Sequence, residues 1–372
     1  MRKLLAWFVG AVMLLGMLPT VSAEPGVSAQ AAILMDADSG RVLYAKNEHN
    51  RQSMASTTKI MTALLALESE QLEQPVTVTR EMVDTEGSSM YLQVGDRLTL
   101  ETLVYGLLLE SGNDAAKAIA ITVEGSEEAF VARMNERARA LGMENTGFET
   151  ASGLDGEGHF STAYDMALLT AAALQNPAFV AICSQSSATV DFVEPAVRRT
   201  LSNHNRLLRE MEGCIGVKTG FTKKSGRCLV SACDRGGIRL IAVTLRAPDD
   251  WNDHKALMDF GYFRLTRVEL REDGMELSLP VVGGVADFVA AAPILSDAVN
   301  LTAEETARLK MRLRVPQFLY APVEEGQLLG RVEYYLDEDC VAEVPIVAKS
   351  AVEYKKKEPT FWEKLKNWLF GK

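Results

Sequence analysis

Ser56-Thr57-Thr58-Lys59 places a hydroxyl and an amine three residues apart, just before a run predicted to form a helix. Residues three apart on a helix share a face, so the Lys59 amine can reach the Ser56 hydroxyl. The first helical turn also offers unpaired N–H groups and the positive end of the helix dipole, which favour negative charge on oxygen. The pattern predicts a serine nucleophile activated by a neutral amine. Alone, the same four residues are more often a helix cap followed by a surface lysine.

Two downstream motifs favour the catalytic interpretation. Ser111-Gly112-Asn113 forms a short polar break between apolar, helix-like runs, 55 residues after Ser56. Lys218-Thr219-Gly220 ends a predicted strand, 107 residues after Ser111. Each triplet is common by itself. In this order and at these separations, the three motifs are the signature of penicillin-binding proteins and class A β-lactamases.

Beyond these motifs, the chain resembles the low-molecular-weight penicillin-binding proteins, which are serine-type D-alanyl-D-alanine carboxypeptidases. The resemblance extends from Ala31 to Val352 and rests on five blocks: MASTTKIMTALLALE, GSSMYLQVGDRLTLETLVYGLLLESGNDAA, ASGLDGEGHFSTAYDMALL, GVKTGFTKKSGRCLVSA and LYAPVEEGQLLGRVEYY. It implies a peptidoglycan stem peptide ending in D-Ala-D-Ala as the substrate. It also implies acylation of the same serine by β-lactam antibiotics.

The resemblance also implies roles for individual residues. Ser56 would attack the penultimate D-alanine carbonyl, Lys59 would take the serine proton, and Ser111 would relay a proton to the leaving amine. The substrate-binding residues would be Asn113, Lys218, Thr219, Gly220, Phe221 and Arg239. Among them, Asn113 would hold the substrate amide, and Phe221 would share an N–H oxyanion hole with Ser56. Thr219, Lys218 and Arg239 would bind the terminal carboxylate.

Secondary expectations concern the rim of the site. The loop Gly87-Ser88-Ser89 and the pair Asp155 and His159 are predicted to line the cleft, although Gly-Ser-Ser is also an ordinary loop sequence. The motif Ser-Gly-Asn stands where many relatives have Ser-Asp-Asn, a departure that fits carboxypeptidases.

Three alternative functions are open for a chain of this kind. A class A β-lactamase would carry a Glu-x-x-Leu-Asn loop, which is absent from the residues around Glu144 and Glu149. A DD-endopeptidase would cut peptide cross-links with the same residues. A non-enzymatic wall-binding protein would need a damaged set of motifs, whereas all three are intact.

Composition excludes several other classes of function. The formal net charge is −11, which gives no electrostatic reason to bind nucleic acid. The four histidines form no HxxxH or HExxH pattern and the five cysteines show no metal-type spacing, so we expect neither a metal nor a cofactor. Free thiols are favoured over disulfides because a chain this long can bury a sufficient core.

The N-terminus predicts an export signal over residues 1–23. Arg2 and Lys3 precede an apolar run from Leu4 to Leu18, and Val21-Ser22-Ala23 supplies the small residues of a cleavage site. A transmembrane anchor is the alternative, but the apolar run is short. Removal of the two cations would change the net charge from −11 to −13. The predicted location is the outer face of the cytoplasmic membrane, where the protein would be peripheral.

The order of predicted elements defines the fold class as α+β. A hairpin over 32–44 is followed by a helical block, with helices at 128–141 and 162–174, a cap at Thr99 and a cap at Ser161. A β section from Cys214 to Leu245 and a helix over 253–262 close the domain. Because this order does not alternate βαβ, it predicts an antiparallel sheet built from both ends of the domain, with helices flanking it and an inserted helical subdomain. This penicillin-binding domain is expected over 27–268.

The remaining chain predicts two further parts. Alternating apolar residues with Gly and Pro breaks indicate a small all-β domain over 270–350. Residues 353–372 predict an amphipathic helix that binds a membrane surface. Its apolar face comprises Phe361, Trp362, Leu365, Trp368, Leu369 and Phe370, and lysines lie on the opposite side. The helix is too short to span a bilayer.

Overall fold

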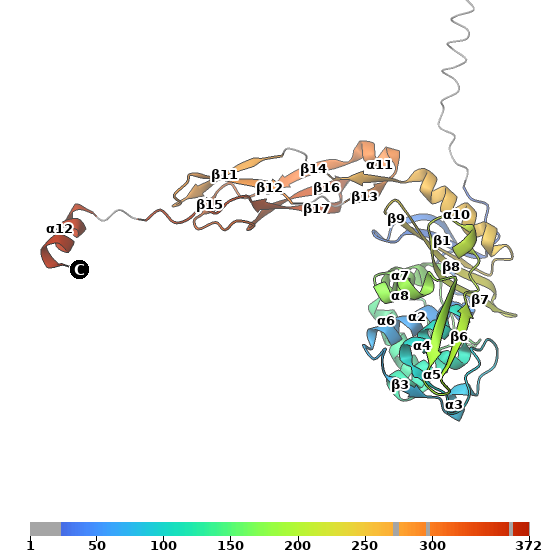
Figure 1. Ribbon diagram of the computed structural model, residues 1–372. Helices are drawn as coiled ribbons and strands as arrows, with labels where there is room; N and C mark the ends of the chain where they lie inside the picture. The colour runs from blue at the N-terminus through green and yellow to red at the C-terminus, as the bar shows by residue number, and fades with distance from the viewer. Residues whose placement is uncertain (1–23, 271–274, 295–297, 357–359, 372) are drawn as a thin grey trace, which may run out of the picture. The chain divides into compact units, whose positions relative to one another are not determined.

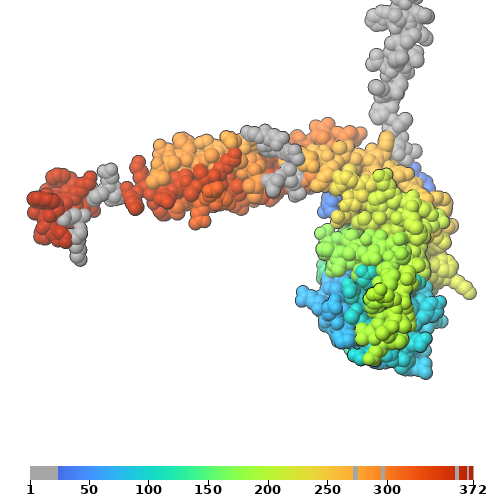
Figure 2. All heavy atoms as spheres, viewed as in Figure 1, coloured from blue at the N-terminus to red at the C-terminus, as the bar shows by residue number. Residues whose placement is uncertain are grey.

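The computed structural model describes residues 24–270, 275–294, 298–356 and 360–371 (Figure 1). The predicted export signal at 1–23 lies outside the described residues. The chain forms two compact units, of which the first ends at Phe263 and the second begins at Arg264. Figure 2 shows the first unit in blue to yellow and the second in orange to red.

The first unit contains a five-stranded antiparallel sheet in the order β2-β1-β9-β8-β7. Its strands are β1 (Ala31–Asp36), β2 (Val42–Lys46), β7 (Cys214–Thr222), β8 (Gly226–Arg235) and β9 (Ile238–Leu245). The N-terminal hairpin joins the C-terminal strands through the β1–β9 pair, because both segments are rich in residues that sheets bury. The predicted sheet, assembled from both ends of the domain, is confirmed.

Helices inserted between the two parts of the sheet form most of the core. They are α2 (Lys59–Glu68), α3 (Arg80–Val83), α4 (Leu100–Leu109), α5 (Asn113–Glu124), α6 (Glu127–Ala140), α7 (Ala163–Leu174), α8 (Pro177–Cys183) and α9 (Leu207–Glu210). Every residue of α2 from Lys59 to Leu67 is buried. A helix that is apolar on all sides packs inside a domain rather than on its surface. The nucleophile motif is thus attached to the centre of the core.

Alternate residues of β1 face different helices. Ile33 and Met35 belong to the core shared with α2 and α7, whereas Leu34 lies under α10 (Asp250–Arg264) at Gly261. A methyl group on Gly261 would come within 2.5 Å of Leu240. His254 of α10 lies between the hydroxyls of Ser231 and Thr244, which fixes the helix over β8 and β9. The sheet is therefore covered on both faces.

The N-terminal capping residues of the helices agree with the sequence prediction for α4 and differ from it for α7. Thr99 and Ser126 cap α4 and α6 through their side-chain oxygens, and the Thr99 cap was predicted. The predicted cap of α7 at Ser161 is wrong. The Thr162 hydroxyl accepts from the Asp165 N–H, while the Ser161 hydroxyl contacts Thr146 instead. Two adjacent hydroxyl residues made the sequence ambiguous at this position.

Two small hairpins complete the first unit. They are formed by β3 (Pro75–Thr77) with β4 (Arg97–Thr99), and by β5 (Ser187–Phe192) with β6 (Val197–Ser202). The second hairpin lies across α4 on the near face of the unit (Figures 1 and 2).

The second unit is built mainly of strands, and the predicted all-β domain is confirmed. A six-stranded sheet has the order β14-β16-β17-β12-β11-β15, and β10 pairs with β13. The elements are β10 (Thr266–Glu269), β11 (Leu277–Val282), β12 (Phe288–Pro293), β13 (Ala298–Leu301), α11 (Ala303–Arg308), β14 (Lys310–Arg314), β15 (Leu319–Tyr320), β16 (Leu328–Leu336) and β17 (Asp339–Ala348). Val344, Ile346 and Ala348 alternate inward on β17, as expected for a strand with one buried face.

The last helix is α12 (Phe361–Phe370), at the position where the sequence predicts one. Five of its six apolar side chains are largely open to solvent, with exposed fractions from 57% for Leu369 to 80% for Trp368, while Leu365 is half-buried. In the part of the chain that the structure describes, no single helix is long and apolar enough to cross a membrane. The bent pair α7 and α8 meets that test only together, across an angle of 106°.

Candidate active site

Ser56 lies in the 3₁₀ turn η2 (Ala55–Thr58), directly before α2. Ala55 has a φ of +49°, a conformation that costs an alanine roughly 1 kcal/mol or more and that persists only where the surroundings enforce it. Strand β7 passes close to this turn at Gly220. A Cβ at that position would lie 3.0 Å from Ser56 N and 3.1 Å from Met54 O. A glycine is therefore required where the Lys-Thr-Gly strand meets the nucleophile turn.

Lys59 makes three close polar contacts with its side-chain nitrogen. Nζ lies 2.9 Å from Ser56 Oγ, 2.7 Å from Asn113 Oδ1 and 2.6 Å from the carbonyl oxygen of Ser152. The residue is completely buried. Burial, and then the positive charge of Lys218, lower the pKa of Lys59 well below 10.5. Asp114 acts in the opposite direction but does not cancel the shift.

These contacts determine how a neutral amine must be oriented. A neutral lysine has two N–H groups and one lone pair. Asn113 Oδ1 and the Ser152 carbonyl can only accept hydrogen bonds, so they take the two N–H groups. The lone pair is left facing the Ser56 hydroxyl, which can then donate its proton to Lys59. This orientation is the one a general base requires.

Ser111 and Asn113 come from the loop between α4 and α5. Ser111 is buried in a left-handed conformation with a φ of +59°. Asn113 begins α5, and its Nδ2 donates to the carbonyl oxygen of Glu86, at 2.6 Å. This bond fixes the amide so that Oδ1 points to Lys59. The second motif thus positions the amine of the first.

Asp114 anchors the rim of the site, and the sequence reasoning did not single it out. Its carboxylate accepts hydrogen bonds from Met90 N, Leu92 N and Ser89 Oγ, and Asn113 N donates to the Ser88 carbonyl. The loop that carries the predicted Gly87-Ser88-Ser89 is therefore tied to the first turn of α5. The sequence feature that could have identified Asp114 is its place directly after Ser-Gly-Asn, as an acidic residue at a helix N-terminus.

Lys218 extends along β7 and is 2% exposed. Its Nζ donates to the carbonyl oxygen of Thr219 at 3.0 Å, and burial lowers the pKa of Lys218 to about 7. His204 lies nearby. Its own burial, followed by the charge of Lys218, lowers the pKa of His204 below 6.5, although Glu110 opposes the shift. The site therefore holds two buried amines, Lys59 and Lys218, and water solvates the charged form of each poorly.

A cavity of about 310 Å³ joins the three motifs. The predicted residues Ser56, Ser88, Ser111, Thr219, Gly220 and Phe221 line it, together with four that the sequence reasoning missed: His204, Arg227, Asp250 and Trp251. Arg227 Nε donates to Asp250 Oδ1 at 2.8 Å. No spacing pattern connects these four residues to the motifs. Arg227 is brought in by the β7–β8 pairing, Asp250 and Trp251 by the start of α10, and His204 by the loop that follows β6.

Arg239 is placed differently from the expectation. It lies on β9, where Nε and Nη2 donate to Asp234 Oδ2 at 3.4 and 3.3 Å, and it does not line the cavity. In the sheet register, Lys218 lies level with Val230 and Val243. Arg239 lies four residues from Val243, which is roughly 13 Å along β9. Strand β9 is itself two strands away from β7, which carries Lys218. The structure therefore does not bring Arg239 to the site.

His159 and Asp155 support the nucleophile turn from behind. His159 Nδ1 accepts from the Glu149 N–H, which leaves Nε2–H to donate to Thr58 Oγ1 at 2.8 Å. Burial lowers the pKa of His159 to about 4, so the ring is neutral at neutral pH. Asp155 accepts from Ser53 Oγ at 2.8 Å. Both side chains hold the segment that leads into η2.

Within residues 24–270, 275–294, 298–356 and 360–371, no group of three or more His, Cys, Asp or Glu side chains could hold a metal ion. All five cysteines are free thiols. The arrangement present, a serine hydroxyl in contact with a buried amine, is one that can support nucleophilic catalysis by the serine.

Comparisons with known proteins agree with this arrangement. The family model described as D-alanyl-D-alanine carboxypeptidase matches residues 19–249, and the model of the C-terminal domain of penicillin-binding protein 5 matches residues 268–354. D-alanyl-D-alanine carboxypeptidase DacF of Bacillus subtilis is 31% identical over 94% of both chains. DacC of Escherichia coli is 34% identical over 88% of this chain and 85% of its own.

A solved structure shows the same fold over both units. Penicillin-binding protein 5 from Haemophilus influenzae superimposes with a TM-score of 0.69 and 28% identity, over 89% of this chain and 99% of the other. The chain belongs to the D-alanyl-D-alanine carboxypeptidase family. The resemblance seen in the sequence is confirmed.

Proposed function

We propose that the protein removes the terminal D-alanine from peptidoglycan stem peptides through an acyl-enzyme on Ser56. The observation that carries this proposal is the contact between Ser56 Oγ and a fully buried Lys59 amine whose two N–H groups are already used. The family of the chain supplies the substrate class.

In this mechanism, Ser56 Oγ bonds to the penultimate D-alanine carbonyl carbon while its proton moves to Lys59 Nζ. The oxyanion is stabilised by the N–H groups of Ser56 and Phe221, which the close passage at Gly220 brings near each other. The proton on Lys59 is then relayed through Ser111 to the leaving amine, and the Asn113 Nδ2–H that is not donated to Glu86 binds the substrate amide. The C–N bond breaks, D-alanine leaves, and water then hydrolyses the ester.

The terminal carboxylate needs a cation inside the cavity, and Arg227 fits this role better than Arg239. Arg227 lines the cavity with Ser56, and Asp250 binds only its Nε. Among the described residues, its two terminal nitrogens form no hydrogen bond, so they can form a bidentate pair with a carboxylate. Thr219 supplies a hydroxyl on the same wall.

Arg227→Gln should lower kcat/KM for a diacyl peptide ending in D-Ala-D-Ala by about 10- to 100-fold, the range expected from loss of a hydrogen bond to a charged group. The matched variant Arg239→Gln should stay within about twofold of the unchanged protein, since Arg239 pairs with Asp234. Steady-state D-alanine release measures both. A larger loss in Arg239→Gln than in Arg227→Gln would contradict this assignment.

The nucleophile assignment is tested by mass spectrometry. Ser56→Ala should abolish D-alanine release and the covalent penicillin adduct together, because one oxygen performs both attacks. In the unchanged protein, the adduct should map to the peptide that contains Ser56. A penicillin adduct that persists in Ser56→Ala would refute Ser56 as the nucleophile.

We further propose that the protein is exported and binds a membrane surface through α12. The support for export is the signal-like composition of residues 1–23. The support for membrane binding is the exposure of Phe361, Trp362, Trp368 and Phe370, each more than 70% exposed, on a helix flanked by lysines. Aromatic rings beside cations are typical of interfacial helices.

Deletion of residues 353–372 should release the protein from membranes while D-alanine release from a soluble peptide stays within about twofold, because the active site lies in the first unit. Trp362→Ala with Trp368→Ala should weaken binding to anionic lipid vesicles without removing the lysines. Unchanged membrane fractionation of the deletion variant would contradict the role of α12.

A further inference from the structure

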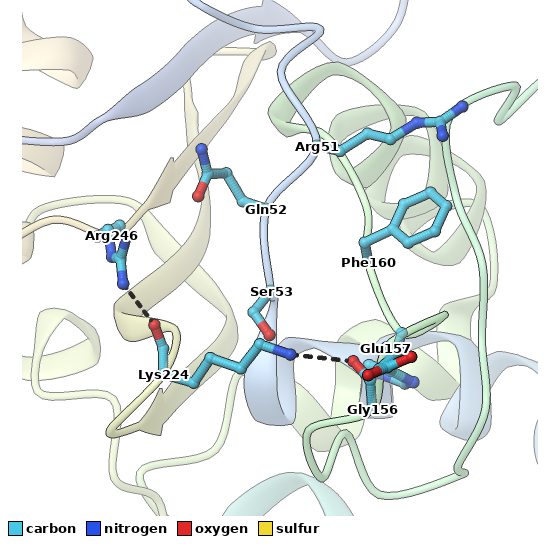
Figure 3. A pocket seen from close by; sticks show the side chains of 9 residues that line it. Arg51, Gln52, Ser53, Gly156, Glu157, Phe160, Lys224 and Arg246 are labelled. Carbon is cyan, nitrogen blue, oxygen red and sulfur yellow. Dashed lines mark hydrogen bonds between the residues drawn. The ribbon is translucent and has the colours of Figure 1, made fainter.

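A second cavity, of about 290 Å³, lies beside the nucleophile turn and is distinct from the catalytic cavity (Figure 3). Arg51, Ser53, Glu157, Phe160, Lys224 and Arg246 line it. Lys224 enters from the turn between β7 and β8, and Arg246 follows the end of β9. Arg51 lies on the other side, against Phe160. Three cations from remote parts of the chain thus line one cavity, and the Arg51 guanidinium extends over the Phe160 ring, away from Lys224 and Arg246.

None of these cations is neutralised by a described residue. Arg51 donates to Asn145 Oδ1 at 3.1 Å and stacks on the Phe160 ring at 4.7 Å. Lys224 Nζ donates to the Gly156 carbonyl at 3.1 Å, and Arg246 Nη2 donates to the Lys224 carbonyl at 2.7 Å. These acceptors are neutral, so the bonds orient the cations without cancelling their charge.

The side chains that line the cavity carry three cations and one carboxylate, while the carboxylates of Asp155, bonded to Ser53, and of Glu149, against Gly156, stand next to the lining and reduce its net positive charge. Glu157 is its one carboxylate, and it forms no ion pair with any residue that the structure describes. His159 also lines the cavity, but the ring is neutral because burial lowers the pKa of His159 to about 4. The chain as a whole carries a formal charge of −11. Like charges held together repel, and a bound anion would relieve that repulsion.

The position of the cavity relative to the catalytic serine indicates which anion it receives. Ser53 lies three residues before Ser56, so the two are at most about 11 Å apart. The same loop provides the Ser152 carbonyl to Lys59 and the Gly156 carbonyl to Lys224. A peptide bound at Ser56 can therefore reach this cavity with about three residues.

We infer that this cavity binds a carboxylate on the acyl arm of the substrate, about three residues from the bond that is cut. The inference rests on the proposed carboxypeptidase function. In that reaction the leaving group is a single amino acid, and Arg227 and Thr219 in the catalytic cavity account for its carboxylate. Any further anionic group that extends to Lys224 must belong to the acyl arm.

The test uses two D-Ala-D-Ala peptides that differ in one group, a free carboxylate or its carboxamide on the third residue before the cut bond. The ratio of their kcat/KM values isolates the contribution of that charge. The full chain should prefer the carboxylate by about tenfold, as expected for charge-assisted hydrogen bonds at a partly exposed site. The preference should shrink at 0.5–1 M salt, where the Debye length is about 3–4 Å.

Lys224→Met and Arg246→Met should each reduce the ratio severalfold toward one. Lys223→Met is the matched control, because Lys223 is exposed in the same turn and does not line the cavity. That variant should keep the ratio. A ratio near one in the unchanged protein, or an equal reduction in Lys223→Met, would overturn the inference.

A binding measurement separates this inference from the proposed function. Calorimetry with Ser56→Ala compares the affinities of the two peptides without turnover, and the carboxylate peptide should bind about tenfold more tightly. If neither peptide releases D-alanine but the tenfold difference in affinity remains, only the carboxypeptidase function is contradicted. Equal affinities, with D-alanine release retained in the unchanged protein, would contradict only the anion site.

Discussion

Lys59 is completely buried, and the rest of the catalytic unit depends on what that burial does to its charge. Deprotonating a lysine with an ordinary pKa of 10.5 at pH 7 costs about 5 kcal/mol. Moving an ammonium ion into a low-dielectric interior costs of the order of 20 kcal/mol in the idealised limit, and still several kcal/mol after relaxation. Lys218, a second buried amine, adds repulsion. The neutral form of Lys59 is therefore favoured, and only that form can accept the Ser56 proton.

The surrounding structure keeps this amine buried and oriented. Asn113 and the Ser152 carbonyl use its two N–H groups, and Asn113 is itself fixed by Glu86. Ala55 and Ser111 both have positive φ angles, so each catalytic loop holds a conformation that the isolated chain would avoid. Asp114 on one side and His159 on the other bind the loops that enforce these conformations. This polar network, packed within the core, therefore holds the Lys59 amine at a defined position beside Ser56.

Much of this arrangement was predictable from the sequence. Ser56 and Lys59 stand next to a long apolar helix, and the intervals to Ser111 and Lys218 indicated three segments that meet. The antiparallel sheet built from both ends of the domain followed from the absence of βαβ alternation. Sequence periodicity could not supply His204, Arg227 or Trp251, because their place in the cavity depends on the loop after β6, on strand register and on the start of α10. The expectation for Arg239 failed for the same reason, since two strands separate it from Lys218.

The most direct measurement of the central claim is an NMR titration of the Lys59 amine in protein labelled with ¹³C at lysine Cε. The resonance can be assigned by its loss in Lys59→Arg. We predict that the pKa of Lys59 lies well below 10.5 because the amine is buried, and that acylation by penicillin declines as the pH falls through the same midpoint. A Lys59 resonance that remains charged up to pH 9 or above would contradict the account.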